Sequence, residues 1–238
     1  MNDVGLYTAA YRFLFLGMIL VDSFINSLFP VISNMFSNAR ESFEKACRKS
    51  LQLLFIITIP IAVSLSLLAR PIVLFLYGAK LEQSAEVLKW LIWVIVPYGV
   101  SQIFGYAMVA SKRQNFDLMV NALGMIVNFA LNWIFIHTYG YMGAAYAGLC
   151  SIGIYVLLQL PIIVSRIIVV KISRFVADVA KILGAALFMV GFILIFQRQN
   201  FIGVSMASFL VYGLALIGFG AFSKSDKDMI IKFLGKSQ

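Results

Sequence analysis

Charged and metal-binding side chains are scarce in this sequence. Only 12% of its 238 residues are charged, and it holds one histidine and two cysteines. Soluble domains carry about 25% charged residues. At 62% hydrophobic residues and a mean hydropathy of +0.95, a soluble domain of this size would lack the polar surface to cover its apolar part. The composition therefore argues against a water-soluble enzyme, a disordered tail and a disulfide scaffold, and it favours a polytopic membrane protein.

Signatures of catalysis and cofactor binding are also missing. The sequence contains no Walker A motif and no Cys/His cluster, so it predicts neither P-loop nucleotide binding nor a zinc site. Cys47 and Cys150 are interpreted as unpaired small residues. His137 has no acidic residue in the next five positions and is interpreted as a solvated loop histidine. We expect no catalytic residue, no metal and no cofactor, and hence a protein that is not an enzyme.

What the sequence does contain is a series of long apolar runs. A helix needs about 20 mostly apolar residues to cross the hydrocarbon core. Seven runs meet this condition, and they lie near 10–33, 50–69, 88–110, 117–136, 143–164, 181–197 and 201–222. The predicted fold is therefore all-α, a polytopic membrane bundle over 1–222 followed by a basic cytoplasmic tail over 223–238.

One stretch, 51–77, is longer than a single crossing requires. It is interrupted by Pro60 and by the pair Arg70-Pro71. One interpretation is a crossing helix to about Ala69, then a short amphipathic helix over 71–78 that ends at Gly78. The alternative is one long tilted helix, and the sequence alone favours neither.

Basic residues are distributed unequally between alternate loops. Segments 37–49, 165–181 and the tail each carry four Lys or Arg, and 111–116 carries two. On the other side, 70–89 carries three, 198–200 carries one and 137–142 carries none. By the positive-inside rule the richer side is cytoplasmic, which predicts an outside N-terminus and a cytoplasmic C-terminus. The net charge of +9 is thus explained by topology, and no nucleic-acid partner is expected.

Three asparagines lie on one stripe of the 117–136 run. Asn121, Asn128 and Asn132 project within about 40° of one another at 100° per residue. Amides that face hydrocarbon would be unsatisfied, so the stripe should face protein or a wet cavity. It either bonds to neighbouring helices or contacts a hydroxyl-rich ligand, because amides both donate and accept.

The first run carries Arg12, Asp22 and Asn26. Ionisable groups inside a span are costly and tend to face an aqueous path or a partner. Asp22 lies near the middle of the run, whereas Arg12 lies near its outer end, where snorkelling alone can solvate it. These three residues, with the three asparagines, are the candidate cavity residues.

A ladder of small residues marks the 143–164 run. Gly143, Ala147 and Ser151 are spaced by four, with Ala144 and Gly148 beside them. Small residues at this spacing let another helix approach closely.

Several segments together resemble a known transporter family. The segments that carry the resemblance, in order, are 4–12 (VGLYTAAYR), 30–33 (PVIS), 74–78 (LFLYG), 84–88, the Asn-rich 121–132 and 139–145 (YGYMGAA). They are similar to the polysaccharide and lipid-linked oligosaccharide flippases of the multidrug/oligosaccharidyl-lipid/polysaccharide exporter superfamily. The resemblance covers about residues 4–165, and the last two runs match only in hydropathy.

The resemblance implies the C-terminal half of a two-lobe exporter with about fourteen spans, in the bacterial cytoplasmic membrane. A missing N-terminal lobe would then be its partner, and the chain would once have continued upstream. The family moves a lipid-linked oligosaccharide across the bilayer by alternating access. On this chain, Arg12 would be the cationic contact for a pyrophosphate, and Asn26, Asn121, Asn128 and Asn132 would be glycan contacts.

Three other interpretations remain open. A cation-coupled drug exporter of the same superfamily would use Asp22, the only mid-span acid, in a more hydrophobic cavity. A membrane-embedded polymerase or acyltransferase needs catalytic Arg, His or acidic groups in a large external loop. The longest one here, 70–89, is too short and carries no such constellation, which argues against this class. The chain could also be an inactive truncated remnant.

Overall fold

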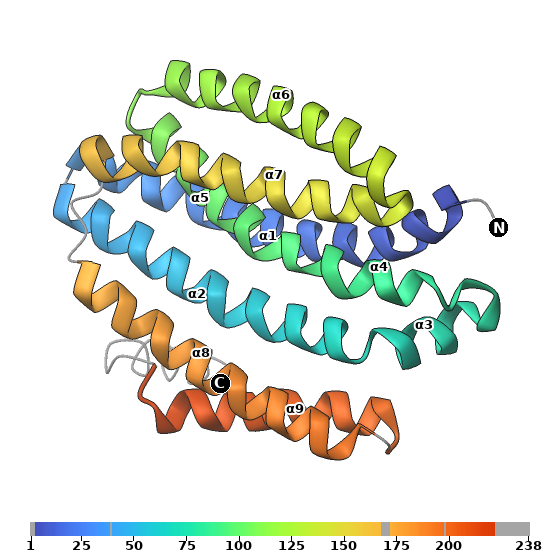
Figure 1. Ribbon diagram of the computed structural model, residues 1–238. Coiled ribbons are helices and arrows are strands. Elements are labelled where there is room, and N and C mark those ends of the chain that lie inside the picture. The colour runs from blue at the N-terminus through green and yellow to red at the C-terminus, as the bar shows by residue number, and fades with distance from the viewer. Residues whose placement is uncertain (1–2, 39, 168–171, 198, 222–238) are drawn as a thin grey trace. The chain divides into compact units, whose positions relative to one another are not determined.

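The computed structural model describes residues 3–38, 40–167, 172–197 and 199–221, and these form helices joined by short turns. The chain divides into two compact units, Met1–Lys171 and Ile172–Gln238. The first unit contains α1 (Asp3–Asn38), α2 (Arg40–Leu67), α3 (Ala69–Tyr77), η1 (Ala79–Leu81), α4 (Ser84–Leu91), η2 (Ile92–Val94), α5 (Ile95–Ala110), α6 (Gln114–Tyr139), α7 (Tyr141–Ile162) and the π-helical η3 (Ile163–Ile167) (Figure 1). The second unit contains α8 (Ile172–Phe196) and α9 (Phe201–Gly218).

Seven stretches of the described chain are long and apolar enough to cross a membrane. They are Asp3–Leu28, Glu41–Leu67, Ser84–Ala110, Gln114–Tyr139, Tyr141–Ser165, Phe175–Phe196 and Phe201–Gly218. Each corresponds to one predicted run, so the all-α fold and the number of spans are confirmed. The predicted boundaries differ by up to about nine residues, because polar residues that flank an apolar run continue the helix beyond it.

The centre of the first unit is formed by α1, α2 and α5, which pack against one another, and by α7, which packs against α1 and α5. Leu14, Leu54 and Ala147 are among its buried side chains. Glycines permit the closest approaches: a Cβ added at Gly17 would lie 2.6 Å from a methyl carbon of Ile95. Such close van der Waals packing holds the helices together. The hydrophobic effect contributes little here, because apolar side chains gain little free energy by moving from lipid into protein.

The 51–77 stretch is two helices, so the alternative of one long helix is wrong. The first, α2, continues through Pro60 and ends at Leu67, and α3 begins at Ala69 and ends at Tyr77. Pro71 occupies the first turn of α3, where its missing N–H leaves no intrahelical bond unmade. Gly78 follows with φ +70°, a left-handed value that favours glycine.

The third span consists of three consecutive helical segments. The pieces α4, η2 and α5 follow one another without a break, and the 3₁₀ turn η2 lies just before Pro97. A proline ring crowds the carbonyl four residues back and removes one N–H, so the backbone tightens at this point. The site described below takes residues from both sides of this turn.

The predicted loop over 37–49 is wrong. Helix α1 continues to Asn38 and α2 already begins at Arg40. The segment is polar, but Arg, Glu and Lys are good helix formers, so polarity alone does not end a helix.

A tight turn joins α6 to α7 and sets their approach. Gly140 caps α6 with φ +59°. Three residues later, a Cβ added at Gly143 would lie 2.0 Å from the carbonyl oxygen of Phe135. Figure 1 shows α6 running alongside α7. The predicted small-residue ladder therefore begins at a real close approach.

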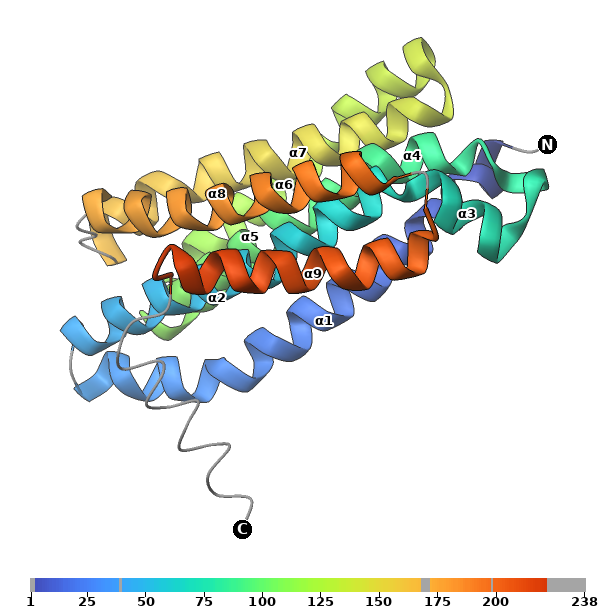
Figure 2. The ribbon, with the colours of Figure 1, turned by 90° about the horizontal axis from the view of Figure 1, so that it is seen from below.

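The second unit is an antiparallel pair. Figures 1 and 2 both show α8 and α9 side by side. The Asn200 side chain caps α9 by accepting from the Ile202 N–H at 3.0 Å. The Lys181 ammonium donates to the Gly220 carbonyl at 3.2 Å. The predicted basic tail over 223–238 lies outside the described residues.

Candidate functional site

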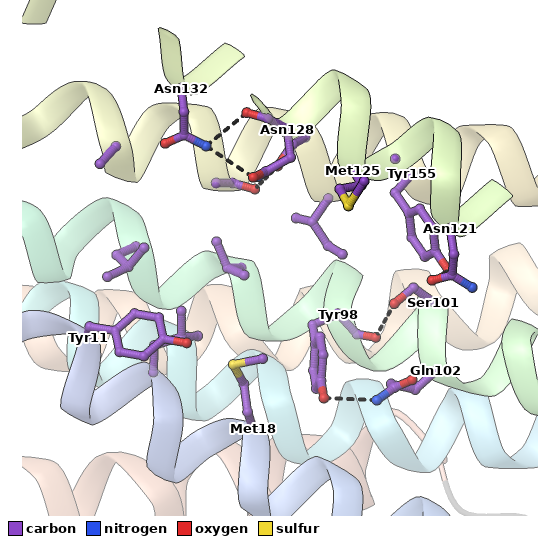
Figure 3. A pocket seen from close by; sticks show the side chains of 18 of the residues that line it. Tyr11, Met18, Tyr98, Ser101, Gln102, Asn121, Met125, Asn128, Asn132 and Tyr155 are labelled. Atoms are coloured by element: carbon purple, nitrogen blue, oxygen red, sulfur yellow. Dashed lines mark hydrogen bonds between the residues drawn. The ribbon is translucent and has the colours of Figure 1, made fainter. Parts of the chain in front are cut away.

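The first unit contains an open cavity of about 570 Å³ between α1, α6, α7 and the third span, which consists of α4, η2 and α5. Its size is typical of small-molecule sites, which run from about 300 to 1,000 Å³. Figure 3 shows side chains from facing helices directed into this space. It is lined by Tyr7, Tyr11, Leu14, Met18, Leu91, Val94, Tyr98, Ser101, Gln102, Asn121, Gly124, Met125, Asn128, Asn132, Ala144, Gly148, Ser151, Ile152 and Tyr155.

All three asparagines of the predicted stripe line the cavity from α6. The Asn128 amide donates to the Ser151 hydroxyl of α7 at 2.8 Å. The Asn132 amide donates to the Asn128 carbonyl at 2.9 Å and to its side-chain oxygen at 3.2 Å. At the other end, the Asn121 side-chain oxygen accepts from the Tyr155 hydroxyl at 2.8 Å. The stripe thus bonds to a neighbouring helix and faces a cavity at once.

A second polar group faces the stripe from α5. The Gln102 amide donates to the Tyr98 hydroxyl oxygen at 2.8 Å, and the Ser101 hydroxyl donates to the Tyr98 carbonyl at 2.7 Å. Figure 3 shows Tyr98 and Gln102 on the opposite side of the cavity from Asn121 and Tyr155.

The predicted Asp22 lies behind this group, outside the cavity lining. Its Oδ1 accepts from the Tyr98 hydroxyl at 2.8 Å and from the Gln102 amide at 3.2 Å. Asn26, one turn later, accepts from the Tyr106 hydroxyl at 2.7 Å. Both residues therefore connect α1 to α5, and Asp22 orients two residues that do line the cavity.

Arg12 also lies outside the lining, on the exposed side of α1. Among the described residues that line this cavity, none is Asp, Glu, Lys, Arg or His. The six candidate residues thus separate into three that face the cavity, two that join α1 to α5 and one that is exposed.

The tyrosines of the cavity were not among the predicted site residues. Tyr7 and Tyr11 lie on one face of α1 with their ring centroids 6.0 Å apart and their planes at 24°. Tyr98 and Tyr155 contribute further hydroxyls from α5 and α7. The four-residue spacing of Tyr7 and Tyr11 was a visible signal, but single aromatics near the end of a span are equally typical of a membrane interface.

A second hollow of about 610 Å³ lies at the 70–89 connection. Its charged side chains are largely paired: Arg70 contacts Glu82 at 2.7 Å, and Lys89 contacts Glu86 at 2.6 Å. In the described part of the chain, no group of three or more His, Cys, Asp or Glu side chains is placed to hold a metal ion.

Comparison with known proteins assigns the chain to a family. The profile of the lipid II flippase MurJ family matches residues 5–217. The chain belongs to the MurJ family. The match runs through the last two spans, so the resemblance is not restricted to residues 4–165 as the shorter segments suggested. Within the exporter superfamily, the matched family is MurJ.

Two known proteins are similar to this chain, one in sequence and one in fold. The probable low-salt glycan biosynthesis flippase Agl15 of Haloferax volcanii is 23% identical over 154 residues, which is 64% of this chain and 33% of that protein. A solved structure of lipid II flippase MurJ in an inward closed conformation is 22% identical, with a TM-score of 0.74, and it matches 98% of this chain and 48% of that one. The chain therefore shares the MurJ fold and spans about a third to a half of the length of these relatives.

Proposed function

We propose that this chain forms one lobe of a transporter that moves a lipid-linked oligosaccharide across the membrane. Membership of the MurJ family and the flippase relatives support this function. The single observation that carries it is the amide- and hydroxyl-lined cavity among apolar spans. Polar groups in a span are costly to keep unless they contact a partner or a water-filled path.

The cavity offers hydrogen-bond partners that replace those a sugar headgroup loses when it leaves water. Each hydroxyl of a glycan loses hydrogen bonds to solvent, at a cost of several kcal/mol if no partner replaces them. Asn121, Asn128 and Asn132 offer both donors and acceptors along one side, and Gln102 and Ser101 face them. The lipid tail would stay in the bilayer while the headgroup occupies the cavity.

The second lobe is part of the proposal. The solved MurJ structure is about twice as long as the segment matched here. On α6, the side chains of Met125, Ile126 and Phe129 are exposed beside the asparagine stripe. A facing lobe would cover the open side of the cavity and would let it open to each membrane surface in turn.

Arg12 is the proposed contact for the phosphate of the lipid carrier. It is exposed and directly follows the cavity residue Tyr11 in α1. An arginine binds phosphate in a bidentate manner. In this arrangement the phosphate stays at the rim, next to the acyl chain, while the glycan lies inside.

The drug-exporter alternative is less well supported. It requires a largely hydrophobic cavity with Asp22 as the acidic coupling residue. The cavity here carries amides and hydroxyls, and Asp22 is engaged by Tyr98 and Gln102. Drug efflux that depends on Asp22, without transport of lipid-linked sugars, would favour this alternative.

The proposal is tested by a flipping assay. Cells depleted of their own flippase would express this chain alone or together with the N-terminal lobe of a MurJ-family relative, and surface exposure of a labelled lipid-linked oligosaccharide would be followed. We expect flipping with the second lobe present, and at least a tenfold loss in the variant Asn128→Ala/Asn132→Ala, because two amide contacts are removed.

The matched control is Ile134→Ala, a residue of α6 that is 55% exposed and does not line the cavity. It should flip like the wild type. Equal flipping by the double asparagine variant and the control would contradict the proposed role of the cavity.

A further inference from the structure

We infer that the connection between α2 and α4 is a docking surface for the headgroups of anionic phospholipids. The surface consists of α3, η1 and the hollow that Arg70, Lys80 and Lys89 help to line. We call this region the interfacial surface. It shares no lining residue with the cavity of the first unit, and its role does not depend on the transport of a lipid-linked sugar.

Helix α3 lies where the chain leaves one candidate span and enters the next. The second span ends at Leu67 and the third begins at Ser84, so α3 and η1 lie between two crossings, on one side of the membrane. Only Leu68 separates α3 from the end of α2. Figure 1 shows α3 at the end of the bundle, beside the beginning of α4. A helix so close to two span ends lies at the depth of the lipid headgroups.

One stripe of α3 holds it against the rest of the first unit. Ala69 and Val73, one turn apart, are buried. The ring of Tyr77, one turn further, lies edge-on to Phe13 of α1 with the ring centroids 6.1 Å apart. Helix α3 also packs against both α2 and α4. Its rotation is therefore fixed, and the directions of its other side chains are fixed with it.

A second side of α3 exposes large apolar groups. Phe75 and Leu76 are 66% and 55% exposed, and at 100° per residue Phe75 projects about 160° away from the buried Val73. In water this apolar area would stay hydrated, whereas acyl chains at the interface remove it from water. Trp90, in α4, is also exposed, and tryptophan is enriched at the same depth. The apolar side of α3 is thus suited to the boundary between headgroups and acyl chains.

The hollow beside α3 carries more cations than carboxylates. Arg70, Lys80 and Lys89 line it together with Glu82 and Glu86. The two ion pairs in the hollow have side chains that are 38% to 71% exposed, and exposed pairs contribute little to stability. Their cations are therefore available to a phosphate. Among the described residues, no carboxylate lies within ion-pair distance of Lys80, so one positive charge is left without a partner.

These features together favour an anionic phospholipid as the occupant. A phosphate in the hollow would be shared by Arg70 of α3, Lys80 of η1 and Lys89 of α4, and arginine can bind it in a bidentate manner. Acyl chains of the same leaflet would cover Phe75 and Leu76. A zwitterionic lipid has the same phosphate but carries its own ammonium group, so it gains less from the net positive charge.

The test titrates the whole chain in detergent with two lipids of identical acyl chains, phosphatidylglycerol and phosphatidylcholine, and follows the bound lipid by native mass spectrometry. We expect phosphatidylglycerol to bind about fivefold more tightly, as one net charge at the interface predicts. Glycerophosphoglycerol, the same headgroup without acyl chains, should not displace the bound lipid at equal concentration, because it cannot cover the apolar side of α3. Displacement would assign the hollow to a soluble phosphate compound and overturn the inference.

Variants then locate the bound headgroup. Arg70→Gln/Lys80→Gln should weaken phosphatidylglycerol binding about tenfold and leave phosphatidylcholine binding unchanged. The matched control, Lys112→Gln/Arg113→Gln, also removes one lysine and one arginine, but from the turn between α5 and α6, outside the hollow. It should bind both lipids like the wild type.

A second pair of variants separates charge from apolar contact. Glu82→Gln/Glu86→Gln removes the carboxylates that compete for Arg70 and Lys89, so phosphatidylglycerol should bind more tightly. Damage to the fold would weaken binding, so this gain cannot arise from misfolding. Phe75→Ser should weaken both lipids alike, because the acyl chains are common to them.

Equal affinity for the two lipids in the wild type would overturn the inference. So would an equal loss in Arg70→Gln/Lys80→Gln and in Lys112→Gln/Arg113→Gln, because the headgroup would then respond only to total charge. Unchanged or weaker phosphatidylglycerol binding in Glu82→Gln/Glu86→Gln would show that the hollow does not hold the phosphate.

Discussion

At the scale of single residues, the polar side chains of the spans have divided roles. The Asn128 side chain lines the cavity, whereas the Asn26 side chain lies outside it and connects α1 to α5. Asp22 is the clearest case of the second role, because one of its oxygens accepts two hydrogen bonds from α5. Its effect on the cavity is therefore indirect, through the positions of Tyr98 and Gln102.

Removal of the Asp22 carboxylate should destabilise the contact of α1 with α5. Asp22→Ala leaves the Tyr98 hydroxyl and the Gln102 amide without their common acceptor, and we expect a loss of about 1–3 kcal/mol in free energy of unfolding. Asp22→Asn keeps a side-chain oxygen at the same place and should lose less. Unfolding in detergent by denaturant, followed by circular dichroism, measures the difference.

Asn26→Ala provides the comparison. Asn26 makes one neutral contact at an exposed position, and such interhelical bonds contribute about 0.6 kcal/mol on average. If Asp22→Ala were no more destabilising than Asn26→Ala, Asp22 would not be the residue that holds Tyr98 and Gln102.

At the scale of the elements, helix α6 depends on its hairpin with α7. Most of its large apolar side chains are exposed, and its packing is chiefly against α7. Its place beside the cavity is therefore set by the turn at Gly140 and by the close approach at Gly143 rather than by burial on several sides.

Gly143→Ala should disrupt this hairpin. The new Cβ would lie 2.0 Å from the Phe135 carbonyl oxygen, and a backbone atom cannot move aside as a side chain can. We expect destabilisation of about 1–3 kcal/mol, measured by thermal unfolding.

Gly153→Ala is the control in the same helix. A Cβ at Gly153 would meet no atom within 4 Å, and alanine is the better helix former. Its stability should equal or slightly exceed that of the wild type. Equal stability of the two alanine variants would show that α6 and α7 do not approach each other closely at Gly143.

At the scale of the whole molecule, the number of spans constrains the topology. Seven candidate spans predict that the two ends of the chain lie on opposite sides of the membrane. The excess of basic residues in alternate connections predicts that segment 137–142 is outside and that the C-terminus is cytoplasmic.

Reporter fusions check this topology. An alkaline phosphatase inserted at Gly140 should be active, and one fused after Gln238 should be inactive, because this enzyme matures only outside the cytoplasm. A green fluorescent reporter at the same two positions should give the opposite pattern. Activity of the phosphatase at the C-terminus would contradict both the orientation and the odd number of crossings.

Much of this arrangement is predictable from the order of the residues. The helical runs were predictable because hydrocarbon demands a long apolar helix whatever its neighbours are. The asparagine stripe was predictable because helical periodicity alone puts Asn121, Asn128 and Asn132 on one side. The division of 51–77 into two helices was left open, since a proline such as Pro60 can lie within a helix as well as end one.

Which polar side chains face the cavity could not be predicted from the sequence. Asp22 and Asn121 are both polar residues in apolar runs, yet one connects α1 to α5 and the other lines the cavity. The difference arises from the rotation of α1 relative to α5, which depends on contacts such as Gly17 with Ile95.

The amino-acid sequence alone determined the membrane class, the seven apolar spans and the shared face of the α6 amides, because each follows from local hydropathy and helical geometry. Only the tertiary structure decided that Tyr11 of α1 faces those amides across the cavity, and that Arg12, Asp22 and Asn26 lie outside its lining. The physical reason is that a helix carries its own periodicity in its residues, whereas the face it turns toward a neighbour depends on close packing with segments far away in the chain.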